Sequence, residues 1–136
     1  MWAYRQVDGW MIDPNKARLA RGYSGNGAGT NNPSMQSVHN VGPIPQGLYH
    51  INTPEDTPTH GPFVLWLTPD PGNTMFDRAG FGIHGDSIEH PGLASDGCII
   101  LSRPAREIIA KSDDETLEVV SGQVFETSTD EGELDT

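Results

Sequence analysis

The sequence lacks a second cysteine and lacks any long apolar run. Its single thiol, Cys98, cannot form an intramolecular disulfide, so the folded chain must be stabilised by burial of apolar side chains. No segment approaches the run of about 20 apolar residues that a transmembrane helix requires. We therefore expect no membrane span.

Basic side chains are also scarce. The chain has 8 Lys and Arg against 19 Asp and Glu, which gives a formal net charge of -11 at pH 7. Proteins that bind nucleic acids or anionic membranes gather Lys and Arg on one surface, so we expect neither as a partner. The N-terminus, "MWAYRQVDGWMIDPN", has no basic stretch followed by an apolar block. We expect synthesis in the cytoplasm without a standard signal peptide.

Gly and Pro, by contrast, are abundant. The 16 glycines and 11 prolines favour short strands joined by many turns over long helices. The length of 136 residues suits one domain. We predict one mostly-β domain over residues 1–125 and an acidic, disordered tail over residues 126–136.

The pattern of apolar residues predicts several short elements and one helix. The predicted strands are a hairpin at 2–12 turning at Asp8-Gly9 and segments 17–23, 48–51, 63–68, 80–85 and 116–120. Segment 54–62, "PEDTPTHGP", is predicted to be a loop. Segment 102–112 is predicted to be a short helix that buries Ala105, Ile108 and Ile109.

The setting of Cys98 points to chemistry. It follows Gly97 in the polar turn "ASDGCII", whereas "GFGIHG" places His84 at the end of a predicted strand. A thiol attacks as the thiolate, and a nearby imidazole can take its proton. Two strands that end in His84 and begin at Cys98 can bring both to one rim, where the amides of Gly97 and Cys98 are candidate oxyanion donors. The plain alternative is an inert, buried cysteine.

A zinc site is the other alternative for this region. His84, Asp86, His90 and Cys98 are ligands of the types that zinc accepts, although their spacing matches no compact zinc signature. The remaining histidines, His39, His50 and His60, have no evident partner in the sequence. We interpret them as surface residues or as residues whose hydrogen bonds are satisfied within the fold.

Three stretches together resemble a known family. "IHG" followed by "SDGCIIL" is similar to the His-Gly and Ser-x-Gly-Cys signature of the YkuD-type L,D-transpeptidase catalytic domain. "GYSGNGAGTNNPSMQSVHNVGPIPQGLYHI" and "WAYRQVDGWM" resemble the branch that includes L,D-transpeptidase/carboxypeptidase effectors of type VI secretion. The resemblance covers roughly residues 2–125.

The resemblance implies a fold, a reaction and a set of site residues. The fold is a single-domain β-sandwich or barrel-like YkuD domain with one short helix after the cysteine. The reaction is acyl transfer on peptidoglycan stem peptides without a cofactor or metal. The implied roles are Cys98 as nucleophile, His84 as base and then acid, Gly85 as the carbonyl that orients His84, Ser95, Asp96 and Gly97 at the oxyanion, and Tyr23 and Ser24 as the border of the cleft.

The resemblance also implies partners and a place of action. A type VI effector would be loaded by a secretion-apparatus component, act in the periplasm of a target bacterium and require an immunity protein in the producer. One position departs from the family, because Ile100 stands where many members have a polar or basic residue; Arg103 is the nearest candidate substitute. The alternative function is a non-catalytic cell-wall-binding component of a phage or secretion apparatus, and a zinc hydrolase is a third.

Overall fold

The computed structural model describes residues 1–123, so the acidic tail predicted at 126–136 lies outside the described residues. The elements follow in chain order as β1 (Trp2–Arg5), β2 (Trp10–Ile12), β3 (Arg18–Arg21), β4 (Tyr23–Ser24), the 3-10 turns η1 (Gly27–Gly29) and η2 (Pro33–Met35), β5 (Gly47–Ile51), β6 (Glu55–Thr57), β7 (Gly61–Pro69), β8 (Gly82–His84), β9 (Ile99–Ile100), α1 (Arg103–Lys111) and β10 (Thr116–Val120).

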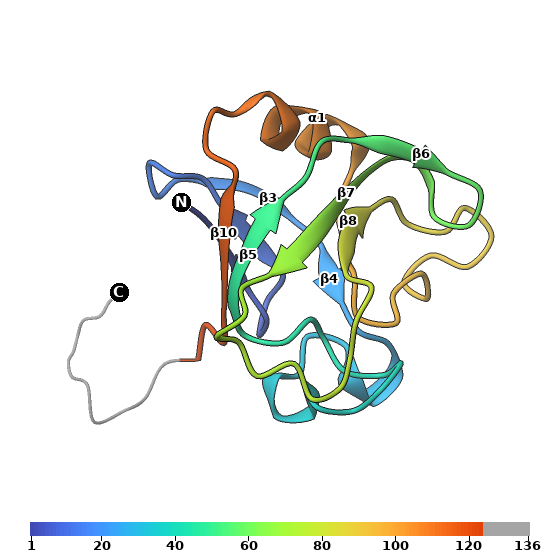
Figure 1. Ribbon diagram of the computed structural model, residues 1–136. Coiled ribbons are helices and arrows are strands. Elements are labelled where there is room, and N and C mark those ends of the chain that lie inside the picture. Colours follow the sequence, from blue (N-terminus) through green and yellow to red (C-terminus); the bar gives the residue numbers. More distant parts are fainter. Residues whose placement is uncertain (124–136) are drawn as a thin grey trace.

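The strands form one open 10-stranded sheet (Figure 1). Its order is β3-β2-β1-β10-β5-β7-β8-β9-β4, and β6 pairs with β7 off this path. The β1–β10 and β8–β9 pairs are parallel, whereas the other pairs are antiparallel. The prediction of a mostly-β domain with one short α-helix after the cysteine is confirmed. The sheet is open, however, and does not close into a barrel.

Two local predictions differ from the structure. The first hairpin exists, but Ala3 pairs with Ile12 and Tyr4 with Met11, so its connection runs from residue 6 to residue 9 and is longer than a two-residue turn. Segment 54–62 is not all loop, since β6 pairs with β7 within it. The side chains of β6 are polar and mostly exposed. Backbone pairing and hydrogen bonds of the Asp56 and Thr57 side chains hold this edge strand, and a hydrophobic pattern does not reveal it.

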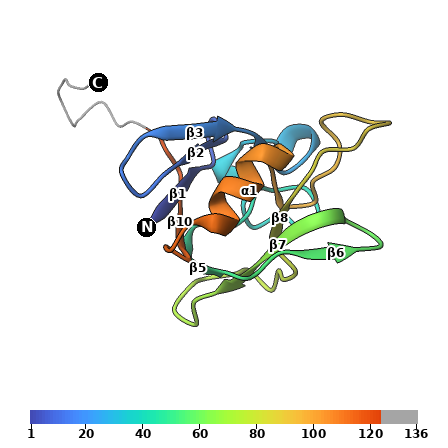
Figure 2. The ribbon, with the colours of Figure 1, turned by 90° about the horizontal axis from the view of Figure 1, so that it is seen from above.

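One face of the sheet and α1 enclose the core. The core includes Trp2, Tyr4, Met11, Leu65, Ile83, Ile99, Ile109 and Leu117. The helix begins after Ser102, whose Oγ accepts a hydrogen bond from the amide of Ala105, and it packs against β7 and β8 (Figure 2).

The inward face of α1 is rotated from the prediction. Ala105 and Ile109 are buried as expected, but Ile108 is 51% exposed and Arg106 is buried instead. Successive residues turn by about 100° around a helix, so the arc from Ala105 through Ile109 to Arg106 extends away from Ile108. This rotation brings a guanidinium group under the loop that follows β8.

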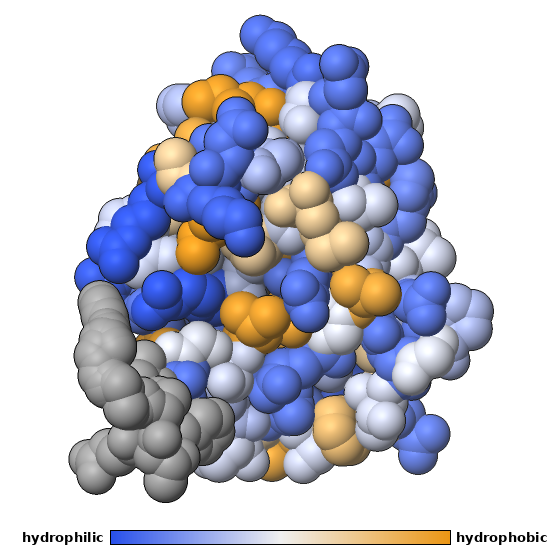
Figure 3. Space-filling model, turned by 90° about the vertical axis from the view of Figure 1, so that its left-hand side faces the viewer, coloured by the Kyte–Doolittle hydropathy of each residue, from blue (hydrophilic) through white to orange (hydrophobic). Residues whose placement is uncertain are grey.

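The surface agrees with the acidic composition. The face shown in Figure 3 is largely hydrophilic, and its apolar side chains stand in small separate groups. Among residues 1–123, no helix has the length and apolar character needed to span a bilayer.

Candidate active site

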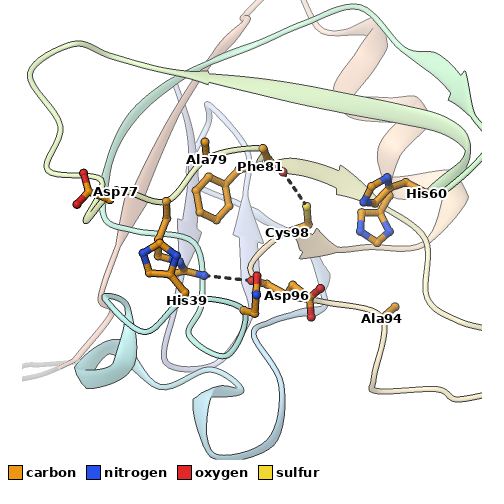
Figure 4. A pocket seen from close by; sticks show the side chains of 12 residues that line it. His39, His60, Asp77, Ala79, Phe81, Ala94, Asp96 and Cys98 are labelled. Carbon is orange, nitrogen blue, oxygen red and sulfur yellow. Dashed lines mark hydrogen bonds between the residues drawn. The ribbon is translucent and has the colours of Figure 1, made fainter.

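The parallel pair β8–β9 brings His84 and Cys98 to the same part of the sheet. His84 is the last residue of β8 and pairs with Ile100, whereas Cys98 directly precedes β9. Because His84 and Ile100 are paired, their side chains point to the same face of the sheet. Side chains two residues apart along a strand also share a face, so Cys98, two residues before Ile100, lies on the same face as His84. Both line a cavity of about 270 Å³. Figure 4 shows Cys98 between Phe81 and His60, with Asp96 nearby.

His84 is held as a neutral base. Its ring is 4% exposed, and Nδ1 lies 2.9 Å from the carbonyl oxygen of Gly85. A carbonyl oxygen only accepts hydrogen bonds, so this contact puts the proton on Nδ1 and leaves Nε2 as the acceptor. Burial lowers the pKa of His84, and the charges of His60 and Arg106 lower it further. The hydrogen bond to Gly85 raises this pKa but does not outweigh the other effects. The imidazole is therefore uncharged at neutral pH.

Cys98 is held as a thiol. Its side chain is 7% exposed, and Sγ lies 3.6 Å from the carbonyl oxygen of Gly80. Burial raises the pKa of the thiol to about 11, although the Gly82 amide and the Arg78 charge act in the opposite direction. The resting site therefore contains a neutral thiol and a neutral imidazole, and it holds no preformed ion pair.

Ser95 fixes the backbone around the cysteine. Its fully buried Oγ donates to the carbonyl oxygen of Cys98 at 2.6 Å and accepts from the amides of Gly25 at 2.9 Å and Gly97 at 3.0 Å. The Gly97 amide, a predicted oxyanion donor, is thus occupied by Ser95 in this structure. Ser95 itself has no exposed surface with which to touch a substrate.

Gly97 lies at a bend in the backbone directly before Cys98. Its φ is +141°, which L side chains rarely adopt. A Cβ atom there would lie 2.6 Å from Nη2 of Arg78 and 2.7 Å from Cε1 of Phe81. Conformation and space both restrict this position to glycine.

Tyr23 and Ser24 support the ends of the loop between β8 and β9. The Ser24 hydroxyl is fully buried, donates to the Gly97 carbonyl at 2.8 Å and accepts from the Ile44 amide at 2.8 Å. The Tyr23 hydroxyl donates to Asp86 at 2.6 Å and accepts from the Ala94 amide. The structure places both beside the loop, and neither lines the cavity of Cys98.

The site lies within a segment that matches a known family. The family model of the Tlde1 domain matches residues 18–123. The chain belongs to the Tlde1 domain family. No curated protein and no solved structure matches the chain. Family membership indicates an antibacterial effector of type VI secretion directed at peptidoglycan, with an immunity protein as its natural partner.

The Tlde1-family site contains an arginine that the sequence analysis missed. Arg78 is 6% exposed and donates to four backbone carbonyl oxygens, those of Gln36, Pro43, Gly42 and Asp96. It joins the loop before β5 to the turn before Cys98. One signal was available in the sequence, because Arg78 is the only Lys or Arg between Arg21 and Arg103.

Two of the histidines that have no evident partner in the sequence, the exposed His39 and the half-buried His60, also line the cavity. The ring of His60 packs edge-to-face against His84, with centroids 5.0 Å apart, and against Trp66 at 5.2 Å. His39 lies at the opposite end, with Nε2 3.0 Å from the carbonyl oxygen of Phe76. His50, in contrast, lies on β5 beside Glu115 and does not line this cavity.

Neither the zinc alternative nor the Arg103 substitute gains support from the geometry. Within the described part of the chain, no three His, Cys, Asp or Glu side chains are grouped so that they could hold a metal ion. Arg103 pairs with Glu107 at 3.0 Å and lies over the ring of Phe63, and it does not line the cavity of Cys98. The buried basic groups near the site are Arg78 and Arg106.

Proposed function

We propose that this protein is an L,D-carboxypeptidase and L,D-transpeptidase that modifies peptidoglycan tetrapeptide stems through an acyl-enzyme on Cys98. One observation carries the proposal: His84 and Cys98, delivered by adjacent parallel strands, line one cavity in a chain of the Tlde1 family. A single cysteine beside a single oriented imidazole is the minimum that nucleophilic thiol catalysis requires.

The first half-reaction forms the acyl-enzyme. Sγ of Cys98 attacks the carbonyl carbon of the bond between meso-diaminopimelate and the terminal D-alanine. Nε2 of His84 takes the thiol proton as the S–C bond forms, and then gives it to the departing amine. The neutral state of both groups supports transfer of the proton during attack, since the raised pKa of the thiol disfavours a resting thiolate.

The second half-reaction releases the acyl group. Water, the amine of a free D-amino acid or the amine of a neighbouring stem attacks the thioester carbonyl carbon, and His84 takes the proton of the attacking group. The C–S bond then breaks, and His84 returns the proton to Sγ of Cys98. These routes give hydrolysis, exchange and cross-linking from one intermediate. We assign stabilisation of the developing oxyanion to the amide of Cys98, which directly follows the turn from Ser95 to Gly97. The Gly97 amide is less suited to this role because it already donates a hydrogen bond to Ser95.

Mass spectrometry of muropeptides tests this function. Purified tetrapeptide muropeptides should lose D-alanine with the wild-type protein, and should exchange it when another D-amino acid is supplied. Cys98→Ala and His84→Ala should abolish both changes, whereas the exposed Ser34→Ala serves as a matched control. Unchanged muropeptides with the wild-type protein, or equal products from the Cys98→Ala variant, would reject the proposal.

A non-catalytic wall-binding role makes a different prediction. Such a protein would sediment with peptidoglycan and leave the mass of every muropeptide unchanged. We favour catalysis because binding alone gives no reason for an oriented, neutral imidazole in the cavity of the thiol. In the favoured case, the type VI apparatus delivers the protein to the periplasm of a target cell, where its substrate lies.

A further inference from the structure

A groove leads away from the Cys98 cavity between the β6–β7 turn and the loop after β8. This groove, of about 870 Å³, shares His60, His84, Ala94 and Asp96 with the Cys98 cavity. It continues into a hollow of about 410 Å³, with which it shares Gly85, Asp86 and Arg106. A ligand that reaches the thiol along this path passes Asp86 and Arg106.

Arg106 offers unused hydrogen-bond donors to the groove. The residue is 5% exposed, and its Nη1 donates to the carbonyl oxygens of Pro62 and Phe63 at 2.9 Å each. Its Nη2 makes no hydrogen bond within residues 1–123, and it lies beside Gly85, where a Cβ atom would approach it to 3.0 Å. A side chain at residue 85 would therefore crowd this guanidinium group.

The charge of Arg106 lacks a counter-ion. No carboxylate in the described part of the chain forms a salt bridge with it. Burial lowers the pKa of Arg106, and the nearby charge of Arg103 lowers it further, whereas the charge of Glu107 acts in the opposite direction. A buried cation without a partner is costly, and a bound anion would relieve that cost.

Asp86 presents the complementary charge on the same two hollows. Its Oδ1 accepts hydrogen bonds from the Tyr23 hydroxyl at 2.6 Å, the Ser87 amide at 2.8 Å and the Gly92 amide at 3.1 Å, whereas Oδ2 accepts only from the same Gly92 amide, at 3.2 Å. All of these donors are neutral. Over residues 1–123, Asp86 takes part in no salt bridge, with Arg106 or with any other cation.

We propose that Asp86 and Arg106 form a subsite for an amino-acid head group that carries both an ammonium and a carboxylate. The carboxylate binds Nη2 of Arg106, and the ammonium binds Oδ2 of Asp86, on either side of Gly85. An acid and a base that line one groove without pairing to each other are complementary to such a zwitterion. The subsite would give the buried Arg106 a bound anion and the exposed Asp86 a bound cation.

The subsite rests on the proposed function for the identity of its ligand. The side chain of meso-diaminopimelate ends in a head of this kind, in the same residue whose carbonyl carbon Cys98 would attack. A free D-amino acid, as acceptor, carries the same chemistry. A lysine-type stem has the ammonium alone and would leave Arg106 unpaired.

Binding to the Cys98→Ala protein tests the subsite without turnover. Three tetrapeptide muropeptides are compared by calorimetry: one with meso-diaminopimelate, one with the side-chain carboxyl of that residue amidated, and one with L-lysine. Because a hydrogen bond to a charged group is worth about 1.5–3 kcal/mol, we expect the dissociation constants of the amidated and lysine forms to rise about tenfold or more. Equal dissociation constants for the three ligands overturn the subsite.

Variants then assign the two charges. In the same Cys98→Ala background, Asp86→Asn should weaken binding of the diaminopimelate form about tenfold, whereas Glu89→Gln, an exposed acid on the same groove, should leave it unchanged. Arg106→Lys keeps the charge and should remove much of the preference for the free carboxylate over the amide, because it loses the planar fork. Equal weakening by Asp86→Asn and Glu89→Gln would contradict the assignment of Asp86.

Competition separates the two sources of the head group. Displacement of the tetrapeptide by D-methionine assigns the subsite to a free amino acid, and the absence of displacement assigns it to the stem. Failure of the proposed chemistry would be detected in a separate experiment, as muropeptides whose masses the wild-type protein leaves unchanged. Whether or not the chemistry is found, the dissociation constants of the three tetrapeptides decide whether the subsite exists.

Discussion

The ring of His60 lies edge-to-face against the ring of His84, with centroids 5.0 Å apart. His60 comes from the turn before β7, and His84 ends β8, so two neighbouring antiparallel strands bring the rings together. The contact places a second titratable imidazole beside the proposed base. A positive charge on His60 disfavours a positive charge on His84 and contributes to the lowered pKa of His84.

Replacing His60 should shift the pH dependence of the reaction. The base must be neutral to accept a proton, so activity is lost as the pH falls through the pKa of His84. His60→Gln removes a group that lowers this pKa, so the pKa should rise and the acidic limb should move to higher pH. The measurement is the rate of D-alanine release against pH, with His50→Gln as the matched control. An acidic limb that stays in place would show that the two rings are not electrostatically coupled.

The thiol of Cys98 should react slowly with alkylating reagents at neutral pH. Burial raises its pKa to about 11, and iodoacetamide reacts with the thiolate. The alkylation rate of the free protein should therefore keep rising with pH above 9, where an ordinary cysteine is already largely ionised. Because the chain has one cysteine, intact mass spectrometry counts the reaction directly as a single adduct. A rate that levels off below pH 8 would instead indicate a resting thiolate and a different first step.

The sequence predicted those parts of the site that depend on local order along the chain. "IHG" and "SDGC" each combine a turn or strand end with a reactive residue, so the pairing of β8 with β9 could be anticipated from them. The bend at Gly97 is also local, since it depends on the backbone of one residue. The helix after Ser102 follows from a capping serine, a proline in the first turn and an apolar stripe.

The residues that were missed depend on contacts between distant segments. His60 and Arg78 reach the site from loops, and an isolated basic residue in a loop gives no periodic signal. Strand β6 was missed because its polar side chains carry no hydrophobic alternation. The burial of Arg106 in place of Ile108 was missed for a similar reason. Which of these two side chains on α1 faces inward depends on the strands that the helix packs against.

Arg78 should be required for the stability of the cysteine turn. Arg78→Lys cannot reproduce four hydrogen bonds to the carbonyl oxygens of Gln36, Gly42, Pro43 and Asp96 with one ammonium group. Loss of part of this buried network should lower the free energy of unfolding by about 2–4 kcal/mol. Urea denaturation measures the change, and Lys111→Arg at the exposed end of α1 should stay within about 0.5 kcal/mol of the wild type. Comparable losses in both variants would contradict a specific role for Arg78.

Gly97 and Gly92 offer a test of packing around the nucleophile, because both have a positive φ but only Gly97 is enclosed. With φ of +141° and +87°, alanine is strained at either position, by about 1–3 kcal/mol. A Cβ at residue 92 would meet open space, whereas at residue 97 it would overlap Arg78 and Phe81. Gly97→Ala should therefore destabilise the protein by about 2 kcal/mol more than Gly92→Ala. It should also displace the guanidinium group that favours the thiolate, so the remaining folded protein should show a changed alkylation rate at Cys98. If urea denaturation gives equal midpoints for the two variants, the cysteine turn is looser than its contacts with Arg78 and Phe81 imply.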